Sequence, residues 1–294
     1  MMIGRIRVKY FIDYFPTTYF TNELINNRFN TWNDESIDKE IILNIYIKQL
    51  PSMNINFGIY IDKNNIEEII INLQKNKFKI NIMFDALCLG NIEFGSEGKN
   101  IIELIDRIIM LKPDYITLTN HFYFNYIKQK YPNINLVFSD YSGVDNVQKI
   151  YRHLEELKCN GLKISINMAK NKDLMHYLKN NFFMESIHLD INKNTINNNI
   201  FEDSLNYNIS HYIQKDKSEE IVNLLENFNE HVKLKGLEIN SLNFEDLSFL
   251  YRIGLNNIWI NSNYMNDKQY YNCVYKFINE KFDKTQIYPL DLAK

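Results

Sequence analysis

The sequence contains little cysteine, no excess of positive charge and no long apolar run. Its three cysteines, Cys88, Cys159 and Cys273, are far apart and form no CxxC pair, which excludes a disulfide framework and a four-thiolate metal site. A formal net charge of −3 excludes the overall basic field used in non-specific nucleic-acid binding, although a nucleic-acid partner stays open. No stretch approaches the roughly 18 apolar residues of a membrane span. We therefore expect a protein of the reducing cytoplasm with no part in the membrane.

Short motifs with a known chemistry are also missing. The chain has no GxGxxG or GxxxxGK[ST] phosphate loop, no HExxH metal motif, no GxSxG nucleophile turn and no radical-type cysteine triplet. The sequence therefore predicts no cofactor and no metal. Cys88, in the stretch "ALCLGN", is the one conceivable thiol nucleophile; without an assured base beside it, a small buried residue is the simpler interpretation.

Strand-like and helix-like stretches alternate along most of the 294 residues. Strands are expected at residues 7–13, 56–62, 79–85, 114–120, 134–140, 161–167, 186–192, 207–210, 236–240 and 257–261. Helices are expected at residues 65–75, 100–112, 144–157, 218–228, 243–252 and 266–280, with Asn100 as the N-cap of the second. This alternation predicts a parallel sheet with right-handed crossovers, and the number of units favours a closed TIM-like (β/α)8-type barrel over an open doubly wound sheet.

The chain shows no linker-like stretch and no repeat of 20 to 50 residues. An apolar fraction of 45% is enough for a sizeable core, so we expect residues 1–294 to form a single barrel domain. Residues 16–51 follow neither periodicity clearly, and we expect them to be an irregular embellishment on the barrel.

The two faces of the expected strands differ in polarity. One parity is almost entirely Ile, Leu and Phe, and should pack against the helices. The other parity should point into the barrel lumen, and its members are Tyr60, Asp62, Asn81, Asp85, Thr117, Thr119, Ser139, Lys163, Ser165, Asn167, Ser186, His188, Asp190, Glu238, Asn240, Trp259 and Asn261. Because burying an unpartnered ionisable group costs several kcal/mol, we expect a hydrogen-bonded, hydrated lumen. An antiparallel sheet with one solvated face would give the same polar parity.

Four residues of the polar parity are candidates for acid–base chemistry: Lys163, His188, Asp190 and Glu238. Lys163 is either a catalytic group or a structural ion-pair partner of Glu238 or Asp190. His188 is either a base or ligand, or simply a hydrogen-bonded interior residue. The candidates for substrate binding are Asp85, His121, Ser139, Asn167, Asn240, Trp259 and Asn261.

Several segments resemble the collagenase-like peptidase family U32. The resemblance is carried by "FDALCLGNIEF" (84–94), by "DYITLTNHFYFNYIKQKYPNINLVFSDYSGVDNVQKI" (114–150) and by "EINSLNFEDLSFLYRIGLNNIWINS" (238–262). With the closing helix "QYYNCVYKFINEKF" (269–282), the family-like core spans residues 56–282. The resemblance implies a barrel, and it relates the chain to proteins that hydroxylate quinones or RNA bases without oxygen.

The departures from the family pattern concern its functional groups. The resemblance would imply an iron–sulfur cluster held by cysteines after the strand at 186–192, where this chain has "KNTINNNIF" with Thr195 and Asn198. The arginines of two late family motifs are replaced by Asn243 and by Asn261 or Ser262. We therefore expect a protein without an iron–sulfur cluster.

Two classes of function follow. In the first, the chain is a divergent enzyme that acts on a peptide or natural-product substrate in the polar lumen. In the second, it is a non-catalytic binding or partner subunit for a peptide, an RNA or a related barrel, with which it would form a homo- or hetero-dimer. No serine, cysteine or metal arrangement supports proteolysis. A Lys163→Met variant should lose ligand binding or activity but keep its fold if Lys163 is functional, and should melt earlier if Lys163 is structural.

Overall fold

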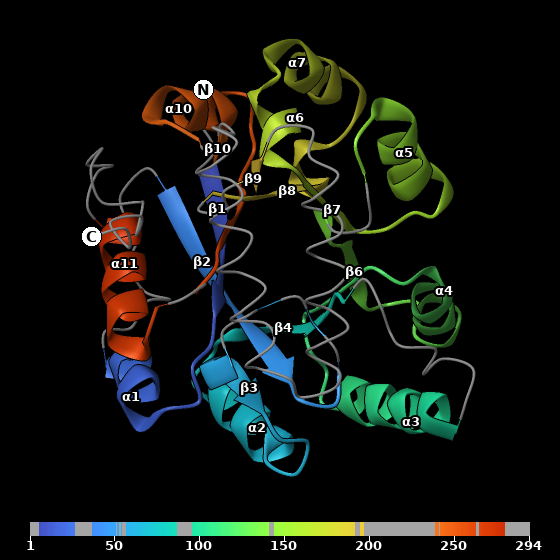
Figure 1. Ribbon diagram of the computed structural model, residues 1–294, viewed down its shortest axis with the longest axis vertical. Helices are drawn as coiled ribbons and strands as arrows, with labels where there is room; N and C mark the ends of the chain where they lie inside the picture. The colour runs from blue at the N-terminus through green and yellow to red at the C-terminus, as the bar shows by residue number, and fades with distance from the viewer. Residues whose placement is uncertain are drawn as a thin grey trace, which may run out of the picture.

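The computed structural model describes residues 6–26, 37–50, 52, 54, 57–86, 96–140, 144–191, 195–196, 239–240, 242–262 and 265–279. Within these residues, eight parallel strands close into a barrel in the order β1, β11, β8, β7, β6, β5, β4 and β2, because β2 also pairs with β1 (Figure 1). The strands are β1 (Ile6–Asp13), β2 (Ile37–Ile47), β4 (Lys79–Phe84), β5 (Tyr115–Leu118), β6 (Asn135–Phe138), β7 (Gly161–Ile164), β8 (Ile187–Asp190) and β11 (Asn257–Ile260). The expectation of a TIM-like α/β barrel is confirmed.

The register of the strands agrees with this closure. Following the paired residues from Ile12 through β11 and around the barrel returns to β2 eight residues beyond Leu43, the direct partner of Ile12. This offset is the shear of eight that characterises TIM barrels. All eight strands run in the same direction, so their carboxyl ends meet at one mouth of the barrel.

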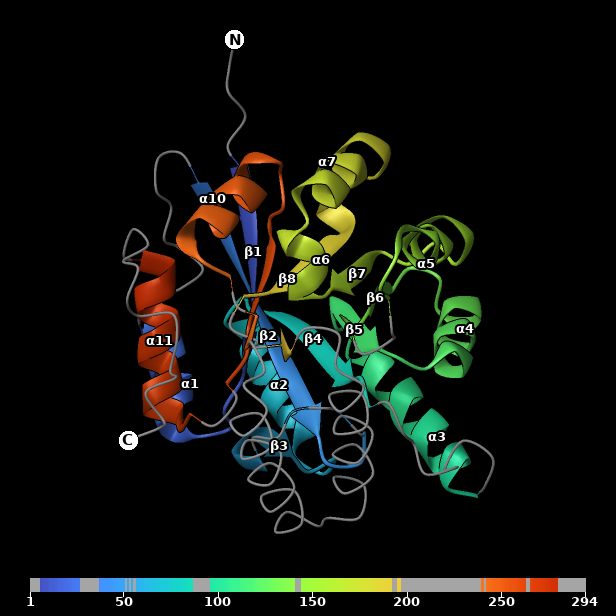
Figure 2. The same ribbon diagram turned by 45° about the horizontal axis from the view of Figure 1, so that its top comes forward.

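Helices follow most strands and surround the barrel, as Figure 1 shows. They are α1 (Thr18–Asn26), α2 (Ile66–Lys75), α3 (Ser96–Met110), α4 (His121–Lys130), α5 (Val147–Tyr151), which continues as a π-helical turn (Arg152–Glu156), α6 (Ile166–Lys170), α7 (Lys172–Asn181), α10 (Phe244–Arg252) and α11 (Asp267–Asn279). Figure 2 shows α1 and α11, from opposite ends of the chain, side by side on the same flank of the barrel. None of the helices in the described part of the chain is long and apolar enough to cross a membrane.

The outer faces of the strands form the core beneath the helices. Ile80 and Ile82 on β4, Leu162 on β7 and Leu189 on β8 are buried, as the apolar parity predicted. Continuous burial on both faces is typical of parallel strands, which are covered by helices outside and by lumen side chains inside.

The interpretation of residues 16–51 as irregular was wrong. The segment contains α1 and the whole of β2, which is the longest strand among the described residues. Residues 41–47 of β2 are all buried, so the strand reads as a continuous apolar run broken only by Asn44 and Tyr46. Alternation, the signal used to find the other strands, is weak in such a run.

Three other boundaries need correction. Residues 56–62 are not a barrel strand: residues 57–59 form a 3₁₀ turn, and β3 (Tyr60–Ile61) adds only to the carboxyl end of β2. Residues 236–240 contribute β10 (Ile239–Asn240), which pairs antiparallel with β9 (Thr195–Ile196) outside the barrel. The segment expected at 161–167 ends as a strand at Ile164, because Ser165 caps α6 by accepting a hydrogen bond from the backbone of Met168.

The helix expected from Asn100 begins earlier, at Ser96, so Asn100 lies inside α3 rather than at its N-cap. The strand expected at 207–210 and the helix at 218–228 lie outside the described residues.

Candidate functional site

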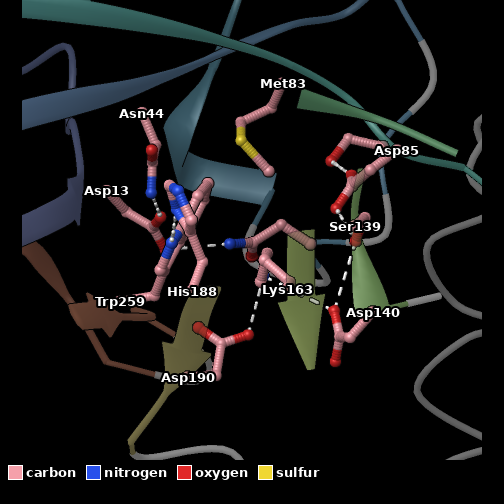
Figure 3. Close-up of polar contacts among 12 residues, drawn as sticks. Asp13, Asn44, Met83, Asp85, Ser139, Asp140, Lys163, His188, Asp190 and Trp259 are labelled. Atoms are coloured by element: carbon pink, nitrogen blue, oxygen red, sulfur yellow. Dashed lines mark hydrogen bonds and ion pairs between the residues drawn. The ribbon is translucent and has the colours of Figure 1, made fainter. Parts of the chain in front are cut away.

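A buried ion pair stands at the mouth of the barrel, where the carboxyl ends of the strands meet. Lys163 Nζ on β7 lies 2.7 Å from Asp190 Oδ2, at the end of β8, and 3.5 Å from Asp140 Oδ1, just after β6. The three side chains are 6% exposed or less. Figure 3 shows that they come from neighbouring strands and gather at one place. Lys163 therefore faces the lumen, as the polar parity predicted, and Asp190 is one of its two expected partners.

The indole ring of Trp259 on β11 covers this ion pair from the side. Lys163 Nζ lies over the Trp259 ring, 4.2 Å from its centroid, in a cation–π contact. Phe11 on β1 stacks on the same ring, with centroids 4.5 Å apart and planes 2° from parallel. Since Phe11 already covers one face of the indole, the ammonium takes the other, and the ring is fixed between them.

His188 lies beneath Trp259 in the lumen. The Trp259 Nε1–H donates to His188 Nδ1 at 3.1 Å, so Nδ1 is an acceptor and the neutral ring carries its proton on Nε2. Burial, and then the charges of Lys9 and Lys163, lower the pKa of His188 well below its ordinary value. His188 is therefore a neutral imidazole that orients the indole.

Gly161 makes room for this imidazole. A Cβ atom at position 161 would come within 2.4 Å of His188 Nε2 and 2.9 Å of His188 Cδ2. The two residues lie on adjacent strands, β7 and β8, and both belong to the lumen parity. Glycine at this position thus allows His188 to lie across the neighbouring strand.

The charges around Lys163 decide its protonation state. Burial by itself lowers the pKa of Lys163, but the charges of Asp190, Asp140 and Asp85 outweigh burial and hold that pKa above its ordinary value. Lys163 is therefore an ammonium ion at any physiological pH.

Asp85, which follows β4, is connected to this cluster through Ser139. The Ser139 hydroxyl lies 3.2 Å from Asp85 Oδ2 and 3.2 Å from Asp140 Oδ1, and Ser52 donates to Asp85 Oδ1. Asp85 is 2% exposed and Ser139 is fully buried. The Ser139 hydroxyl thus connects Asp85 to Asp140, which contacts Lys163 directly.

A fourth carboxylate, that of Asp13 at the end of β1, is the acceptor of a separate network. Its Oδ1 accepts from Asn44 Nδ2 at 3.1 Å and Tyr46 OH at 2.8 Å, and its Oδ2 accepts from Asn54 Nδ2 at 2.9 Å and the Ser262 amide at 2.7 Å. Burial raises the pKa of the Asp13 carboxyl, and the hydrogen bonds from Ser262, Tyr46 and Asn44 oppose that rise. Both oxygens of Asp13 are fully used.

The Asp13 network continues from strand to strand around the barrel. Thr117 on β5 donates to Asn81 on β4, Asn81 donates to Asn44 on β2, and Asn44 donates to Asp13 on β1. Each link joins two adjacent strands, and every donor points the same way. The chain of hydrogen bonds satisfies buried amides that would otherwise cost about 1–3 kcal/mol each.

Asp190 differs from Asp13 because one of its oxygens has no partner. Oδ2 receives Lys163, whereas Oδ1 is buried and makes no hydrogen bond to any described residue. An ionised carboxylate oxygen is an acceptor, and leaving it buried without a donor is costly. Among the described residues at this mouth, Asp190 Oδ1 is therefore a buried carboxylate oxygen that lacks a donor; the Ser262 hydroxyl, just past β11, is also buried without a partner.

The structure brings together most, but not all, of the residues expected from the sequence. Lys163, His188, Asp190 and Trp259 are in direct contact, and Asp85 and Ser139 adjoin them.

His121 begins α4 on the outer side of the barrel wall, where its ring packs against Phe138 and His153 at centroid distances of 5.0 and 5.4 Å. Asn167 lies in the first turn of α6 rather than on a strand. Asn240 belongs to β10 in the small antiparallel sheet, and Glu238 lies outside the described residues. Asn261 directly follows β11 and is half-buried.

Sequence reasoning missed Asp13, Asn44, Tyr46 and Asp140. Asp13 ends the apolar stretch "RVKYFID", and a lone acid at the end of a buried strand was the available signal. Asn44 and Tyr46 lie in the unrecognised β2. Asp140 directly follows Ser139, so strand alternation predicts that its side chain points away from the lumen. Because β6 ends at Phe138, this alternation no longer applies at Asp140, whose side chain contacts Lys163.

The described residues do not fit an iron–sulfur cluster. Cys159 precedes β7 at the amino end of the barrel, where burial raises the pKa of its thiol to about 12, and Cys273 lies on α11 outside the barrel. Cys88 lies outside the described residues. The described part of the chain also contains no group of three His, Cys, Asp or Glu side chains placed to hold a metal ion.

Comparison with solved structures supports the architecture. The chain is similar to "The Structure of the U32 Peptidase Mk0906", with a TM-score of 0.57 and 13% sequence identity over 89% of this chain and 94% of that chain. A second structure is a cube-shaped, highly porous protein cage designed by fusing symmetric oligomeric domains. It matches with 10% identity over 84% of this chain and 79% of that chain, but its TM-score of 0.34 is too low to indicate a shared fold. No protein-family model and no curated protein matches the sequence. The U32-like fold expected from the sequence is thus confirmed.

Proposed function

We propose that this U32-like barrel is an enzyme that binds a small polar or peptide substrate at its mouth, with Asp190 as the group that accepts a hydrogen bond from the substrate. The observation that carries the proposal is the buried, unpartnered Oδ1 of Asp190 beside the Lys163 ammonium. The position agrees with it, since active sites of TIM barrels are built at the carboxyl ends of the strands.

Energetics favour a functional role for the cluster. Taking charges out of water costs several kcal/mol per ion, and apolar side chains of similar volume often replace a buried ion pair with no loss of stability. Val, Ile and Leu side chains in the barrel lumen would stabilise the fold more than Lys163 and Asp190 do. Clusters of this kind concentrate at functional sites.

The role of Lys163 in this proposal is electrostatic. A lysine that forms a Schiff base must be neutral to attack a carbonyl carbon, and such lysines have lowered pKa values. The three carboxylates raise the pKa of Lys163 instead. Lys163 therefore fixes Asp190 Oδ2 and balances its charge, leaving Oδ1 for the substrate.

The experiment compares two isosteric variants on a cell extract. Asp190→Asn removes the charge of the site. Glu40→Gln is the matched control, because Glu40 also pairs with a lysine, Lys79, and also has a buried oxygen without a partner among the described residues, but it lies near the amino ends of β2 and β4, away from the mouth. Small molecules and peptides would be followed by mass spectrometry. Compounds consumed by the wild type and by Glu40→Gln, but not by Asp190→Asn, support the proposal.

Equal consumption by wild type and Asp190→Asn contradicts the proposal. Compounds that are bound by the wild type in native mass spectrometry but never converted favour the non-catalytic binding subunit instead. The expected cytoplasmic location and the dimer with a related barrel stay predictions; the free thiols of Cys159 and Cys273 are compatible with a reducing compartment.

A further inference from the structure

We propose that the group received by Asp190 Oδ1 is a primary ammonium, on a peptide or on a small amine. This inference rests on the proposed function, because it names the chemical class of the substrate at the same site. It is carried by the Asp190 contacts together with the balance of charge around them.

Within the described part of the chain, Asp190 Oδ1 lacks a hydrogen-bond donor. The residue is 3% exposed, its other oxygen is engaged by Lys163, and Oδ1 has no hydrogen-bond partner among the described residues. A ligand atom that reaches it must be a donor, because a carboxylate oxygen repels another acceptor. Donors that carry a positive charge give shorter hydrogen bonds, roughly twice as strong as those of neutral donors.

The charges around Asp190 are mostly negative among the described residues. Asp190, Asp140 and Asp85 all act on Lys163, whereas Lys9 acts on His188 and donates to the Tyr115 hydroxyl at 3.2 Å. Lys163 is itself already engaged by two carboxylates and by the Trp259 ring. An incoming carboxylate or phosphate would meet these acids before it met an available cation, whereas an ammonium meets attraction from all of them.

The arrangement of the described side chains favours an organic cation over a metal ion. A divalent cation needs several oxygen ligands converging on one point. The described residues provide no group of three His, Cys, Asp or Glu side chains with that geometry. A single buried oxygen without a partner matches one N–H of an ammonium and leaves its other two donors for water or for the rest of the ligand.

The test uses the indole proton of Trp259 as a reporter inside the site. The chain has two tryptophans, so the Trp259 signal can be assigned by comparison with a Trp32→Phe variant. Butylamine, butanol and butyrate, which share a four-carbon chain, would each be titrated at pH 7 and followed by proton–nitrogen NMR. We expect butylamine to shift the Trp259 signal saturably, and butanol and butyrate to shift it at least tenfold less at equal concentration.

Variants place the effect at Asp190. We expect Asp190→Asn to weaken butylamine binding at least tenfold and Glu40→Gln to leave it unchanged. If Asp190→Asn does not fold, the wild-type titration alone decides. A second series with the peptide Lys-Gly-Gly amide and its Nα-acetyl and Nε-acetyl forms distinguishes a peptide N-terminus from a side-chain or free amine as the source of the ammonium.

Two results would overturn the inference. A stronger Trp259 shift with butyrate or butanol than with butylamine shows a site of another polarity, which leaves the proposed enzyme intact. The absence of any shift up to the solubility limit of butylamine, or equal binding by Asp190→Asn, also removes the ammonium subsite. The proposed function is judged separately, by consumption of compounds in the extract.

Discussion

Asp13 and Asp190 end two strands on either side of β11, and their carboxylates are satisfied in opposite ways. Asp13 accepts hydrogen bonds from four neutral donors and has no oxygen left. Asp190 is held by one cation and keeps a buried oxygen without a partner. A saturated carboxylate of the first kind stabilises the barrel, whereas an incompletely bonded one costs stability and is available for chemistry.

The largest expected effect is a difference between two isosteric replacements. Asp13→Asn places an NH2 group against two donors whichever way the amide turns, so we expect it to lower the free energy of unfolding by about 4 kcal/mol. Asp190→Asn can turn its carbonyl toward Lys163, which keeps Asp140 as a charged partner 3.5 Å away, so it should cost less, about 2 kcal/mol. Urea unfolding of both variants measures this difference, and equal costs would break the comparison.

Lys163→Met comes next. Because Asp190 Oδ2 lies 2.7 Å from Lys163 Nζ, the single replacement leaves a buried carboxylate without its cation and should cost about 3 kcal/mol whether the pair is functional or structural. The melting test expected from the sequence therefore does not separate the two roles. Because Asp140 also faces Lys163, the variant that separates them neutralises the whole cluster: Lys163→Met with Asp190→Leu and Asp140→Asn. Stability of this triple variant within about 1 kcal/mol of wild type supports a functional cluster, whereas a triple variant as unstable as Lys163→Met indicates a structural one.

Gly161→Ala should have a smaller effect. Its Cβ would overlap His188 Nε2, so the imidazole must move and the hydrogen bond from Trp259 is lost or stretched. We expect a loss of about 2 kcal/mol, within the range for overpacking. The Trp259 indole NMR signal should move at the same time. If His188→Ala in the same chain does not relieve part of the cost, the close approach is not its cause.

The smallest effect concerns pH. The pKa of His188 is lowered well below its ordinary value in the folded state, so below about pH 6.5 the unfolded chain binds more protons than the folded one. Stability should therefore fall with decreasing pH, by about 1 kcal/mol between pH 6.5 and 5.5 for this residue and by about 1.4 kcal/mol per pH unit at somewhat lower pH.

His121 and His153, whose pKa values burial also lowers, add to the slope in the wild type. The test is therefore the difference between wild type and His188→Gln in urea unfolding at pH 6.5 and 5.5. Equal slopes for the two proteins would show that His188 is not kept neutral by the fold.

Much of the lumen could be predicted because a side-chain period of two is visible wherever polar and apolar residues alternate. That signal placed Lys163, His188, Asp190 and Trp259 on one face, and the structure joins all four. It failed for β2, whose buried run hides the alternation, and with β2 it lost Asn44 and Tyr46. The same signal also failed at strand ends. Ser165 is the N-cap of α6, so Asn167 lies in a helix, and the chain turns after β6 so that the Asp140 side chain reaches Lys163. Parity describes a strand but carries no information about where the strand stops.

Ser139 adds a property that neither carboxylate has alone. Its hydroxyl has one hydrogen and lies 3.2 Å from both Asp85 and Asp140, so it can serve only one of them at a time. Rotation of that single bond transfers the hydrogen bond from one acid to the other. The two acids can thus exchange this donor without any movement of the backbone, so Asp140, which contacts Lys163, can gain or lose a hydrogen bond while the strands stay in place.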